Sequence, residues 1–382
     1  MTNNHKINIL FVLPNFDTGG SEKLVIDIIK GLDRTVFNPV LAVFFTGSYE
    51  QEFLKLGVPF YKIHFPKLRF KISTVLFLSR IVRKHRIHLA NTHHTSPLIQ
   101  GFLPFKLFNR VKLIHTEHSP LKFDKKIHSR ALAMEKFLLG KVDAVVGVSK
   151  SVCKYFEDEL HVPARKIRYV PNGIDINRFN LSNFDRQAYR QKLGLREDDV
   201  VVGLFANLRE EKNHHLLIEA LSTLHSQGYD KAKLLLCGSG PKENELRALV
   251  SRLRLENNVI FLGTRFDIPE LMSSIDIYCL PSRYEGMPMS ILEAMAAKKP
   301  VIATNVEGIK EVIENGFNGI LIKENSAEEL ASAISDLIKN ESRRTELSSN
   351  AYDFVKKYSY GEMMKSYENL FLRMLKRNEP TD

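Results

Sequence analysis

Residues 282–296 read Ser-Arg-Tyr-Glu-Gly-Met-Pro-Met-Ser-Ile-Leu-Glu-Ala-Met-Ala and place two carboxylates eight positions apart. The apolar run before them, Ile275–Leu280, predicts a buried strand that a Pro-Ser pair ends. Pro288 suits the first turn of a helix, where its missing N–H has no cost. Glu285 is therefore expected in the loop before a helix, and Glu293 inside it.

The start of that helix is also a candidate anion site. Backbone N–H groups at the first turn of a helix are free and carry the positive end of the helix dipole. A loop carboxylate, a helix carboxylate and such an anion site together suit a sugar, a ribose and a phosphate. The residues expected around the anion are Gly286, Met287, Pro288 and Met289.

This string resembles the paired-glutamate motif of the retaining nucleotide-sugar glycosyltransferases of family 4, which have the two-domain GT-B fold. The resemblance covers nearly the whole chain, strongly in residues 200–325 and loosely in residues 1–170. It implies that Glu285 contacts the hydroxyls of the donor sugar and that Glu293 accepts hydrogen bonds from the ribose. The sequence does not name the sugar or the base of the donor, and a uridine nucleotide is favoured over a guanosine nucleotide.

Length and composition fit a globular enzyme of two domains. The 382 residues suit two cores of about 180 residues each, and 44% of the chain is hydrophobic against 26% charged. No apolar run approaches the roughly 20 residues of a membrane-spanning helix. The three cysteines are odd in number, far apart in the sequence and without the spacing of metal ligands. This pattern favours a protein of the reducing cytoplasm.

The order of apolar runs predicts two parallel sheets. Short strands alternate with amphipathic helices in both halves, which is typical of doubly wound, Rossmann-like domains. Strands are expected at Asn8–Leu13, Val40–Phe45, Ile87–Asn91, Val111–His115 and Ala144–Val148, and then at Val200–Ala206, Lys233–Cys237, Val259–Leu262, Ile275–Leu280 and Val301–Thr304. Ser21–Leu32 is an expected helix.

The fold class expected is therefore α/β, with two doubly wound domains facing across a cleft as in GT-B proteins. Residues 1–180 form the expected acceptor domain, 181–199 a polar linker and 200–358 the donor domain. Residues 359–382 are expected to form a last helix with an apolar stripe. In GT-B proteins such a helix crosses back onto the first domain.

Two glycine turns and two cations extend the donor site. Gly19 and Gly20 follow the first strand, and family members carry a similar turn that faces the diphosphate. Gly238 lies in a further matching turn, and the loop with Arg265 corresponds to the one beside the nucleobase. In the family an arginine and a lysine bind the diphosphate; Lys212 matches the lysine, Asn207 replaces the arginine, and Arg209 is the expected substitute.

Histidines follow two strands of the first half. His118 matches a family histidine that reaches the donor sugar or assists at the reaction centre. His93 and His94 are adjacent, and neighbouring side chains of an extended chain point to opposite sides, which argues against a shared metal. No metal or cofactor is expected, because positive side chains and helix ends supply the charge that the diphosphate needs.

Other function classes fit less well. A nicotinamide-dependent dehydrogenase needs Gly-x-Gly-x-x-Gly, and the turn at Gly238 lacks the third glycine. A metal-dependent transferase needs Asp-x-Asp, and no two aspartates here are two apart. A catalytically inactive relative that binds a nucleotide sugar or a partner subunit stays open, because Asn207 and Glu307 depart from the family pattern.

Charge is concentrated in the first half. Residues 1–180 carry 28 Lys and Arg against 14 Asp and Glu, and the stretch between Phe53 and Thr116 has twelve basic residues and no acid. Such asymmetry indicates an anionic partner. No nucleic-acid-reading motif is present. The basic residues Lys67, Arg69, Lys71, Arg80, Arg83, Lys84 and Arg86, interleaved with Phe70, Leu76, Phe77 and Leu78, instead favour an anionic membrane surface.

The sequence therefore predicts a metal-independent, retaining hexosyltransferase with a hydroxyl acceptor. The acceptor expected is a lipid-linked intermediate of cell-surface polysaccharide synthesis. The expected location is the cytoplasm, with peripheral binding at the inner face of the membrane. A solvated helix whose apolar side packs on the sheet is the alternative explanation of the basic stretch.

Overall fold

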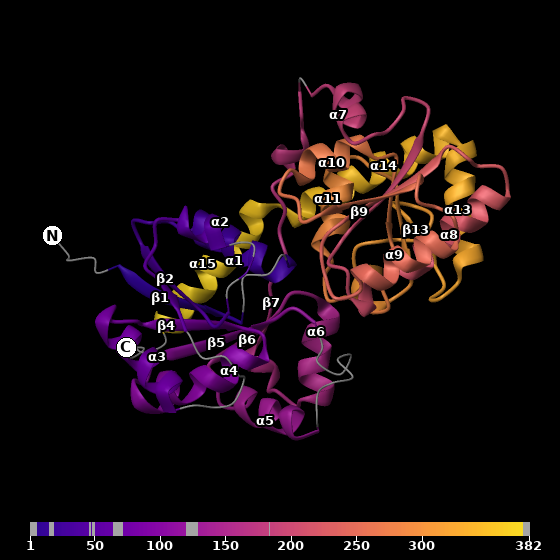
Figure 1. The fold of residues 1–382 in the computed structure, drawn as a ribbon. Coiled ribbons are helices and arrows are strands. Elements are labelled where there is room, and N and C mark those ends of the chain that lie inside the picture. Colours follow the sequence, from indigo (N-terminus) through magenta and orange to yellow (C-terminus); the bar gives the residue numbers. More distant parts are fainter. Residues whose placement is uncertain are drawn as a thin grey trace. The chain divides into compact units, whose positions relative to one another are not determined.

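The computed structural model describes residues 6–14, 19–45, 47, 50–63, 72–119, 129–182 and 184–376. They form two compact units, the first made of Met1–Asn172 with Gly361–Asp382 and the second of Gly173–Tyr360 (Figure 1). The basic residues Lys67, Arg69 and Lys71 lie outside the described residues, as does Phe70.

The first unit is built on a seven-stranded parallel sheet in the order β3-β2-β1-β4-β5-β6-β7. Its strands are β1 (Ile7–Leu13), β2 (Phe37–Val43), β3 (Phe60–Lys62), β4 (Leu89–His93), β5 (Lys112–Glu117), β6 (Ala144–Gly147) and β7 (Ile167–Tyr169). The five strands predicted for this half are all present, with ends shifted by a few residues. The two edge strands, β3 and β7, were not predicted, because three residues make too short an apolar run.

Helices connect these strands. The longer ones are α1 (Gly20–Gly31), α3 (Ile72–Lys84), α4 (Thr95–Phe102) and α5 (Ser129–Leu139). Shorter turns are α2 (Glu50–Leu54), α6 (Lys150–Lys154), the π-helices η1 (Leu103–Phe108) and η3 (Tyr155–Glu159), and the 3₁₀ turn η4 (Ala164–Lys166). The apolar face predicted for α1 is buried, with Leu24, Val25, Ile28, Ile29 and Leu32 at most 3% exposed.

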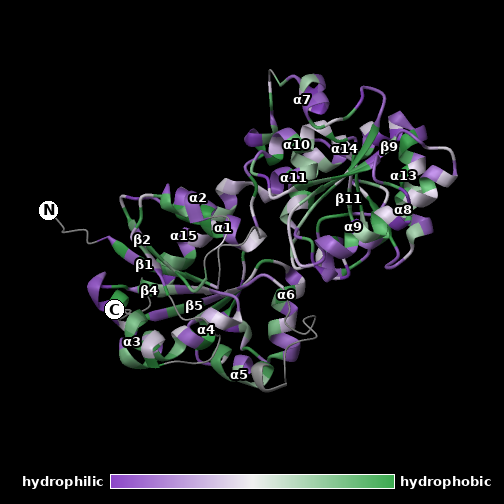
Figure 2. Cartoon of the chain, in the orientation of Figure 1, coloured by the Kyte–Doolittle hydropathy of each residue, from purple (hydrophilic) through white to green (hydrophobic). Residues whose placement is uncertain are grey.

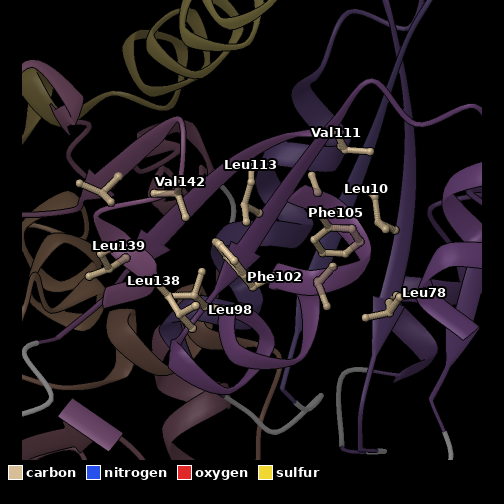
Figure 3. Close-up of a cluster of buried hydrophobic side chains, with 14 of the residues drawn as sticks. Leu10, Leu78, Leu98, Phe102, Phe105, Val111, Leu113, Leu138, Leu139 and Val142 are labelled. Carbon is tan, nitrogen blue, oxygen red and sulfur yellow. The ribbon is translucent and has the colours of Figure 1, made fainter. Parts of the chain in front are cut away.

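The core of the first unit lies between this sheet and its helices. Leu10 of β1, Leu78 of α3, Phe102 of α4 and Phe105 of η1 belong to one buried cluster (Figure 3). Because Leu78 is part of this core, it does not contribute to a surface patch on α3, contrary to the interleaving expected from the sequence.

Helix α15 (Tyr360–Lys376) completes the first unit although it follows the whole of the second in the chain. Phe371 is fully buried, with its ring centroid 6.1 Å from those of both Phe11 and Phe37. The Glu368 carboxylate accepts the backbone N–H of Asp33 at 2.9 Å. The predicted apolar stripe is the buried one: Met363, Met364, Tyr367, Leu370, Phe371 and Met374 are at most 6% exposed.

The second unit contains a six-stranded parallel sheet in the order β10-β9-β8-β11-β12-β13. Its strands are β8 (Val200–Phe205), β9 (Ala232–Cys237), β10 (Val259–Gly263), β11 (Ile277–Leu280), β12 (Val301–Thr304) and β13 (Ile320–Ile322). Five of them match predicted strands, and β13 is again a three-residue edge strand. The strands of this sheet, like those of the first, are mainly hydrophobic (Figure 2).

The helices of the second unit are α7 (Arg186–Lys192), α8 (His214–Ser226), α9 (Glu243–Arg252), α10 (Ile268–Ser274), α11 (Met289–Ala296), α12 (Glu307–Lys310), α13 (Ala327–Lys339) and α14 (Glu341–Val355). Three 3₁₀ turns are η5 (Ile176–Phe179), η6 (Glu210–Lys212) and η7 (Lys356–Tyr358). Residues 181–199, expected as a linker, include α7 and belong to this unit.

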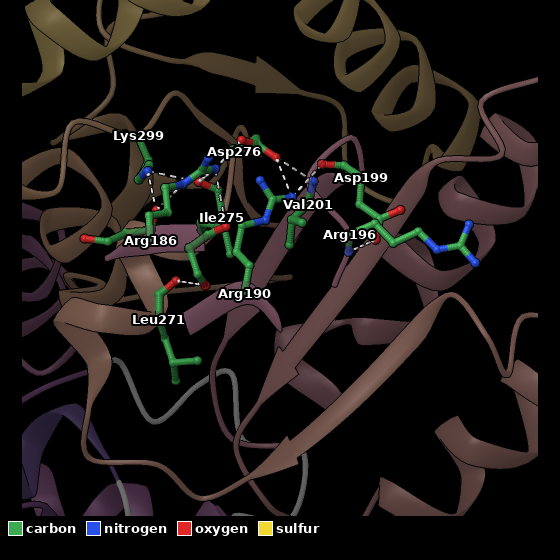
Figure 4. A network of polar contacts seen from close by, with 11 residues as sticks. Arg186, Arg190, Arg196, Asp199, Val201, Leu271, Ile275, Asp276 and Lys299 are labelled. Carbon is green, nitrogen blue, oxygen red and sulfur yellow. Dashed lines mark hydrogen bonds and ion pairs between the residues drawn. The ribbon is translucent and has the colours of Figure 1, made fainter. Parts of the chain in front are cut away.

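Helix α7 is tied to the second unit by a polar network (Figure 4). Arg186 donates to the Asp276 carboxylate at 2.6 Å and to the Ser273 carbonyl at 2.8 Å. Lys299 donates to the carbonyls of Ser273 and Ile275 at 3.1 and 2.9 Å. The polar composition that resembled a linker in the sequence therefore serves these contacts.

Each sheet reverses its strand order once. In the first unit the chain moves outward from β1 through β2 to β3 and then restarts on the other side of β1 with β4. In the second unit the same reversal occurs between β8 and β11. Loops that leave adjacent strands in opposite directions open a crevice at the carboxyl ends, where doubly wound proteins bind ligands. The two reversal points are therefore the places to look for sites.

Among the described residues, none of the helices combines the length and the apolarity needed to cross a membrane.

Candidate functional site

In the second unit, the loops after β8 and β11 meet through an ion pair at the reversal point. The Lys212 ammonium, in η6 after β8, lies 2.6 Å from Glu285 Oε1, in the loop after β11. Ser282 Oγ donates to the same carboxylate oxygen at 2.7 Å. The Glu285 side chain is 8% exposed and that of Lys212 is 23% exposed. The pair therefore faces partly outward, where a ligand can share both charges.

Glu293 lies in α11, one residue past the first turn, and is 7% exposed. Its helix begins at Met289, so Pro288, predicted in the first turn, lies one position earlier as the N-cap residue. Met287 and Met289 are also nearly buried. The loop carboxylate and the helix carboxylate are thus held by elements of different kinds: a loop bonded to η6, and a helix packed into the core.

Arg209 and Lys212 do not pair with the neighbouring Glu210 and Glu211. Glu210 instead pairs with Lys242 and with Arg283, at 2.6 and 2.5 Å. Arg209 is exposed and forms no ion pair with any described residue. One cation of the loop is therefore engaged with Glu285, and the second, Arg209, is available to an incoming anion.

Two glycines of this unit are required by close backbone approaches. Gly238 has φ of +140°, and a Cβ there would lie 2.1 Å from the Ala206 carbonyl oxygen. A Cβ on Gly308 would lie 2.2 Å from the carbonyl oxygen of Gly286. Both glycines therefore let neighbouring loops pack against the loops that carry Lys212 and Glu285. Contact of Gly238 with a donor stays a prediction.

Arg265 is engaged with Asp267, to which it donates from Nε at 2.8 Å. Tyr189 also donates to this carboxylate, at 2.5 Å. The hydrogen bonds from Arg265, opposed by partial burial, lower the pKa of Asp267 to about 2, so the pair is ionised at neutral pH. Arg265 thus has a structural role in fixing its loop, and its predicted place beside a nucleobase stays a prediction.

At the reversal point of the first unit, a hydrogen bond joins the start of α1 to the residue after β4. Ser21 Oγ, at the start of α1, lies 2.9 Å from His94 Nε2, which follows β4. His94 has φ of +67°, a conformation that is uncommon for a residue with a Cβ. Such strained backbone conformations often occur at functional sites. Gly19 precedes α1 and Gly20 begins it, and a Cβ on Gly19 would lie 2.3 Å from a carboxylate oxygen of Glu22.

His118, after β5, stacks on the imidazole of His93. The rings lie 5.3 Å apart, and His93 Nδ1 and His118 Nε2 are 3.0 Å apart. Burial, with the nearby His94, lowers the pKa of His118 to about 3, so its imidazole is neutral at physiological pH. His118 can therefore donate or accept a hydrogen bond but does not act as a resident cation.

The sequence did not predict the roles that several residues of this arrangement have. Ser282 orients Glu285, His93 orients His118, and Glu117 accepts the backbone N–H of His118 at 2.8 Å. Polar residues that end strands could have been noted as a group, because parallel strands bring their carboxyl ends to one edge. Which of them pair depends on strand order, which a single sequence does not contain.

Two family models match the chain, one for each unit. The model described as "Glycosyltransferase Family 4" matches residues 18–178, and the one described as "Glycosyl transferases group 1" matches residues 185–354. Between them they include both reversal points.

Two curated glycosyltransferases are similar to this chain over most of its length. The UDP-Gal:alpha-D-GlcNAc-diphosphoundecaprenol alpha-1,3-galactosyltransferase of Escherichia coli is 26% identical over 69% of either chain. The putative glycosyltransferase EpsF of Bacillus subtilis (strain 168) is 25% identical over 82% of this chain and 83% of its own.

Solved structures agree with these matches. The structure of HepE from Anabaena in complex with UDP and glucose has a TM-score of 0.86 and 26% identity, over 96% of this chain and all of the other. WaaG, involved in lipopolysaccharide biosynthesis, has a TM-score of 0.77 at 18% identity, which bears on the fold alone. With both sheets, both models and relatives along most of its length in agreement, the chain belongs to the group 1 and family 4 glycosyltransferases of the GT-B type.

Proposed function

We propose that this glycosyltransferase moves a hexose from a UDP-sugar to a hydroxyl acceptor with retention of configuration, without a divalent ion on the diphosphate. The observation that carries the proposal is the Lys212–Glu285 pair, braced by Ser282 at the reversal point of the second sheet. It presents a cation and a carboxylate together, which suits a diphosphate next to a sugar hydroxyl.

Each group then has a role in donor binding. Glu285 accepts hydrogen bonds from the sugar hydroxyls, and the buried Glu293 accepts those of the ribose. Lys212 and the exposed Arg209 neutralise the charge that grows on the diphosphate as the sugar bond breaks. The backbone N–H groups at the start of α11 add to that stabilisation.

The transfer step exchanges one bond for another at the anomeric carbon. The acceptor oxygen attacks on the face from which UDP departs, the bond from carbon to phosphate oxygen breaks, and that phosphate oxygen takes the acceptor proton. His118, neutral at working pH, hydrogen-bonds a sugar or acceptor hydroxyl in this step. UDP and the glycosylated acceptor leave with the charges balanced.

The name of the Escherichia coli relative and the complexes of HepE with UDP and UDP-glucose support UDP as the nucleotide. That relative's name also includes a diphosphoundecaprenol acceptor. We therefore propose a lipid-linked glycan as acceptor, with the enzyme bound peripherally at the inner face of an anionic membrane.

The test is a matrix of donors and acceptors. UDP-glucose, UDP-galactose, UDP-N-acetylglucosamine and GDP-mannose are each incubated with polyprenol-diphosphate-linked sugar, and release of nucleoside diphosphate is followed. The expected result is product formation from one UDP-sugar, with an equatorial anomeric proton whose small NMR coupling to the neighbouring ring proton matches that of the α-configured donor. Binding of UDP without turnover on any acceptor would favour the inactive relative, and an inverted product would overturn the proposed stereochemistry.

A further inference from the structure

Three buried side chains of the first unit each present one polar atom that has no hydrogen-bond partner. They are His115 and Glu117 on β5 and Glu135 on α5, and none is more than 1% exposed. The atoms concerned are His115 Nε2, Glu117 Oε2 and Glu135 Oε2. One possible ligand atom from each of the three side chains lies within 4.8 Å of those of the other two. Buried polar groups are rarely left unsatisfied, so such a convergence calls for an explanation.

The other polar atom of each side chain is already bonded. His115 Nδ1 lies 3.1 Å from Thr92 Oγ1, and that hydroxyl donates to the Ile114 carbonyl, so it accepts from Nδ1–H. The lone pair of His115 is then on Nε2, the atom that faces Glu117. Such bonds fix the tautomer and ring orientation of metal-binding histidines in proteins.

The two carboxylates are held in the same way. Glu117 Oε1 accepts the backbone N–H of His118 at 2.8 Å, and Glu135 Oε1 accepts the Thr95 hydroxyl at 3.1 Å. Because one oxygen of each carboxylate is already bonded, the second oxygen is the one left to bind a cation. His115 and Glu117 are two residues apart on one strand, so both project from the same face of the sheet.

We propose that His115, Glu117 and Glu135 bind one divalent transition-metal cation, with zinc the expected ion. Zinc bonds of about 2.0–2.2 Å place the atoms of two ligands roughly 3–4 Å apart. His115 Nε2 and Glu117 Oε2 are 3.6 Å apart, within that range. An imidazole with two carboxylates is a donor set that zinc and manganese accept, and a doubly charged ion balances both carboxylates.

A proton shared by the two carboxylates is the competing explanation, and it accounts for less. It would join Glu117 to Glu135 but leave the lone pair of His115 Nε2 without a donor. One cation accepts a lone pair from all three atoms. The side chain of His94 is 31% exposed and its Nδ1 lies 3.5 Å from Glu117 Oε1, so one side chain separates Glu117 from the surface of the unit.

The ion has a structural role and is separate from the donor diphosphate. Glu117 holds the backbone of His118, so a cation that fixes Glu117 also fixes the segment that carries the proposed functional histidine. The inference does not depend on the proposed function, because metal binding is measured without any sugar donor.

The experiment measures metal in the full chain, purified without a histidine tag or chelator. Inductively coupled plasma mass spectrometry is expected to find stoichiometric zinc that survives gel filtration. Zinc added back to stripped protein should raise its melting temperature, and cobalt should give the visible absorption of a site with nitrogen and oxygen ligands. E135Q and H115Q, which preserve side-chain size, should lose most of the metal.

Matched controls are E157Q and H161N, which change an exposed carboxylate and an exposed imidazole of the same unit. Asparagine suits position 161, where φ is +53°. Both controls should retain the metal. A wild-type protein that stays metal-free in micromolar zinc and melts at an unchanged temperature overturns the proposal. So does metal that is retained by both E135Q and H115Q. The melting shift of the wild type decides the matter if a variant fails to fold.

Discussion

At the scale of single residues, replacing Glu293 and replacing Glu285 are expected to affect different steps, UDP binding and turnover respectively. Glu293→Ala should weaken UDP binding roughly ten- to hundredfold, because a buried hydrogen bond to a charged group is worth about 1.5–3 kcal/mol. Glu285→Ala should bind UDP nearly as well and lose turnover, because the contact proposed for Glu285 is with the sugar and not with the ribose. Calorimetric titration with UDP and steady-state rates separate the two. Undiminished UDP affinity in Glu293→Ala would remove the assigned ribose contact.

The cation beside Glu285 gives a second residue-scale prediction. Lys212→Ala should lose most of its turnover, whereas brief exposure of the wild type to EDTA should leave turnover unchanged, because in the proposed mechanism side chains neutralise the diphosphate. An ion buried among His115, Glu117 and Glu135 is not expected to leave within the assay. The measurement is UDP release with and without chelator. Activity lost at once and restored by magnesium or manganese would contradict a metal-free diphosphate site.

Sequence reasoning located these groups but not their partners. Pro288 and the apolar run before it were enough to put Glu285 in a loop and Glu293 in a helix. The contact of Lys212 with Glu285 joins positions 73 residues apart and depends on β8 lying beside β11. The resemblance assigned Lys212 to the diphosphate, and only the folded chain adds that it also neutralises a carboxylate.

At the scale of elements, α3 and η1 carry the surface proposed to bind membranes. Arg80, Arg83, Lys84 and Arg86 are exposed in or just after α3. Leu76 on the same helix is 53% exposed, and Leu107 and Phe108 of the adjoining η1 are 59% and 57% exposed. Phe77 and Leu78, by contrast, turn toward the core. The sequence therefore identified the exposed cations of α3 and the exposed Leu76, but it wrongly included Phe77 and Leu78 and did not identify Leu107 and Phe108.

The prediction concerns vesicle binding. The wild type should cosediment with vesicles containing phosphatidylglycerol but not with neutral ones, and salt should weaken binding by screening exposed charges. Serine at positions 80, 83, 84 and 86 should release the protein while UDP binding persists.

A matched control replaces four exposed cations of the second unit, Lys192, Arg247, Arg252 and Lys323, with serine, and should still cosediment. If the wild type ignores anionic vesicles at low salt, the acceptor is soluble and the basic face serves another anion.

Lys299 makes the network around α7 sensitive to pH. Burial, with Arg186 nearby, lowers the pKa of this lysine from 10.5 to about 8. Between those values the unfolded chain holds a proton that the folded chain lacks, so the folded state gains stability as pH rises from about 8 to about 10.5. The gain is on the order of 3 kcal/mol.

Urea unfolding of the wild type and of Lys299→Met across this pH range measures the effect. The difference in unfolding free energy between the two proteins should change by that amount, since other titrating groups cancel in the comparison. Parallel curves for the two proteins would show that Lys299 keeps its ordinary pKa in the folded state.

Sequence periodicity failed mainly at the edges of the sheets. β3, β7 and β13 have three residues each and lie at sheet edges, where few apolar side chains are needed. Helix α7 was missed because its residues are mostly polar and resembled a linker. Composition alone does not show whether charged side chains contact the protein, as Arg186 does, or only water.

At the scale of the whole molecule, the two-sheet fold followed from the alternation of strands and helices. The return of α15 to the first unit followed only from the resemblance, because an apolar stripe does not specify which surface covers it. Its anchoring residue is Phe371, whose ring is packed between β1 and β2 side chains.

Phe371→Ala is expected to destabilise the first unit by about 3–5 kcal/mol, through the lost apolar contact and the cavity left behind. Hydrogen exchange should accelerate in peptides from β1 and β2 and stay unchanged in those from β8 and β9. Leu337→Ala, at a fully buried position of α13, should give the reverse pattern. Equal acceleration in both units would mean that they unfold as one.

The chain passes between the units twice, after Asn172 and after Tyr360, and these passages adjoin each other. Ile174 pairs with Ser359, and its carbonyl accepts the backbone N–H of Tyr360 at 3.0 Å. The second unit is therefore an insertion within the first. On the ribosome, the inserted unit can finish folding while the first still lacks α15 and exposes the apolar surface around Phe11 and Phe37. Nascent chains stalled before residue 361 should accordingly bind chaperones through the first unit, which is synthesised first but lacks α15. The second unit, although synthesised later, is by then already folded.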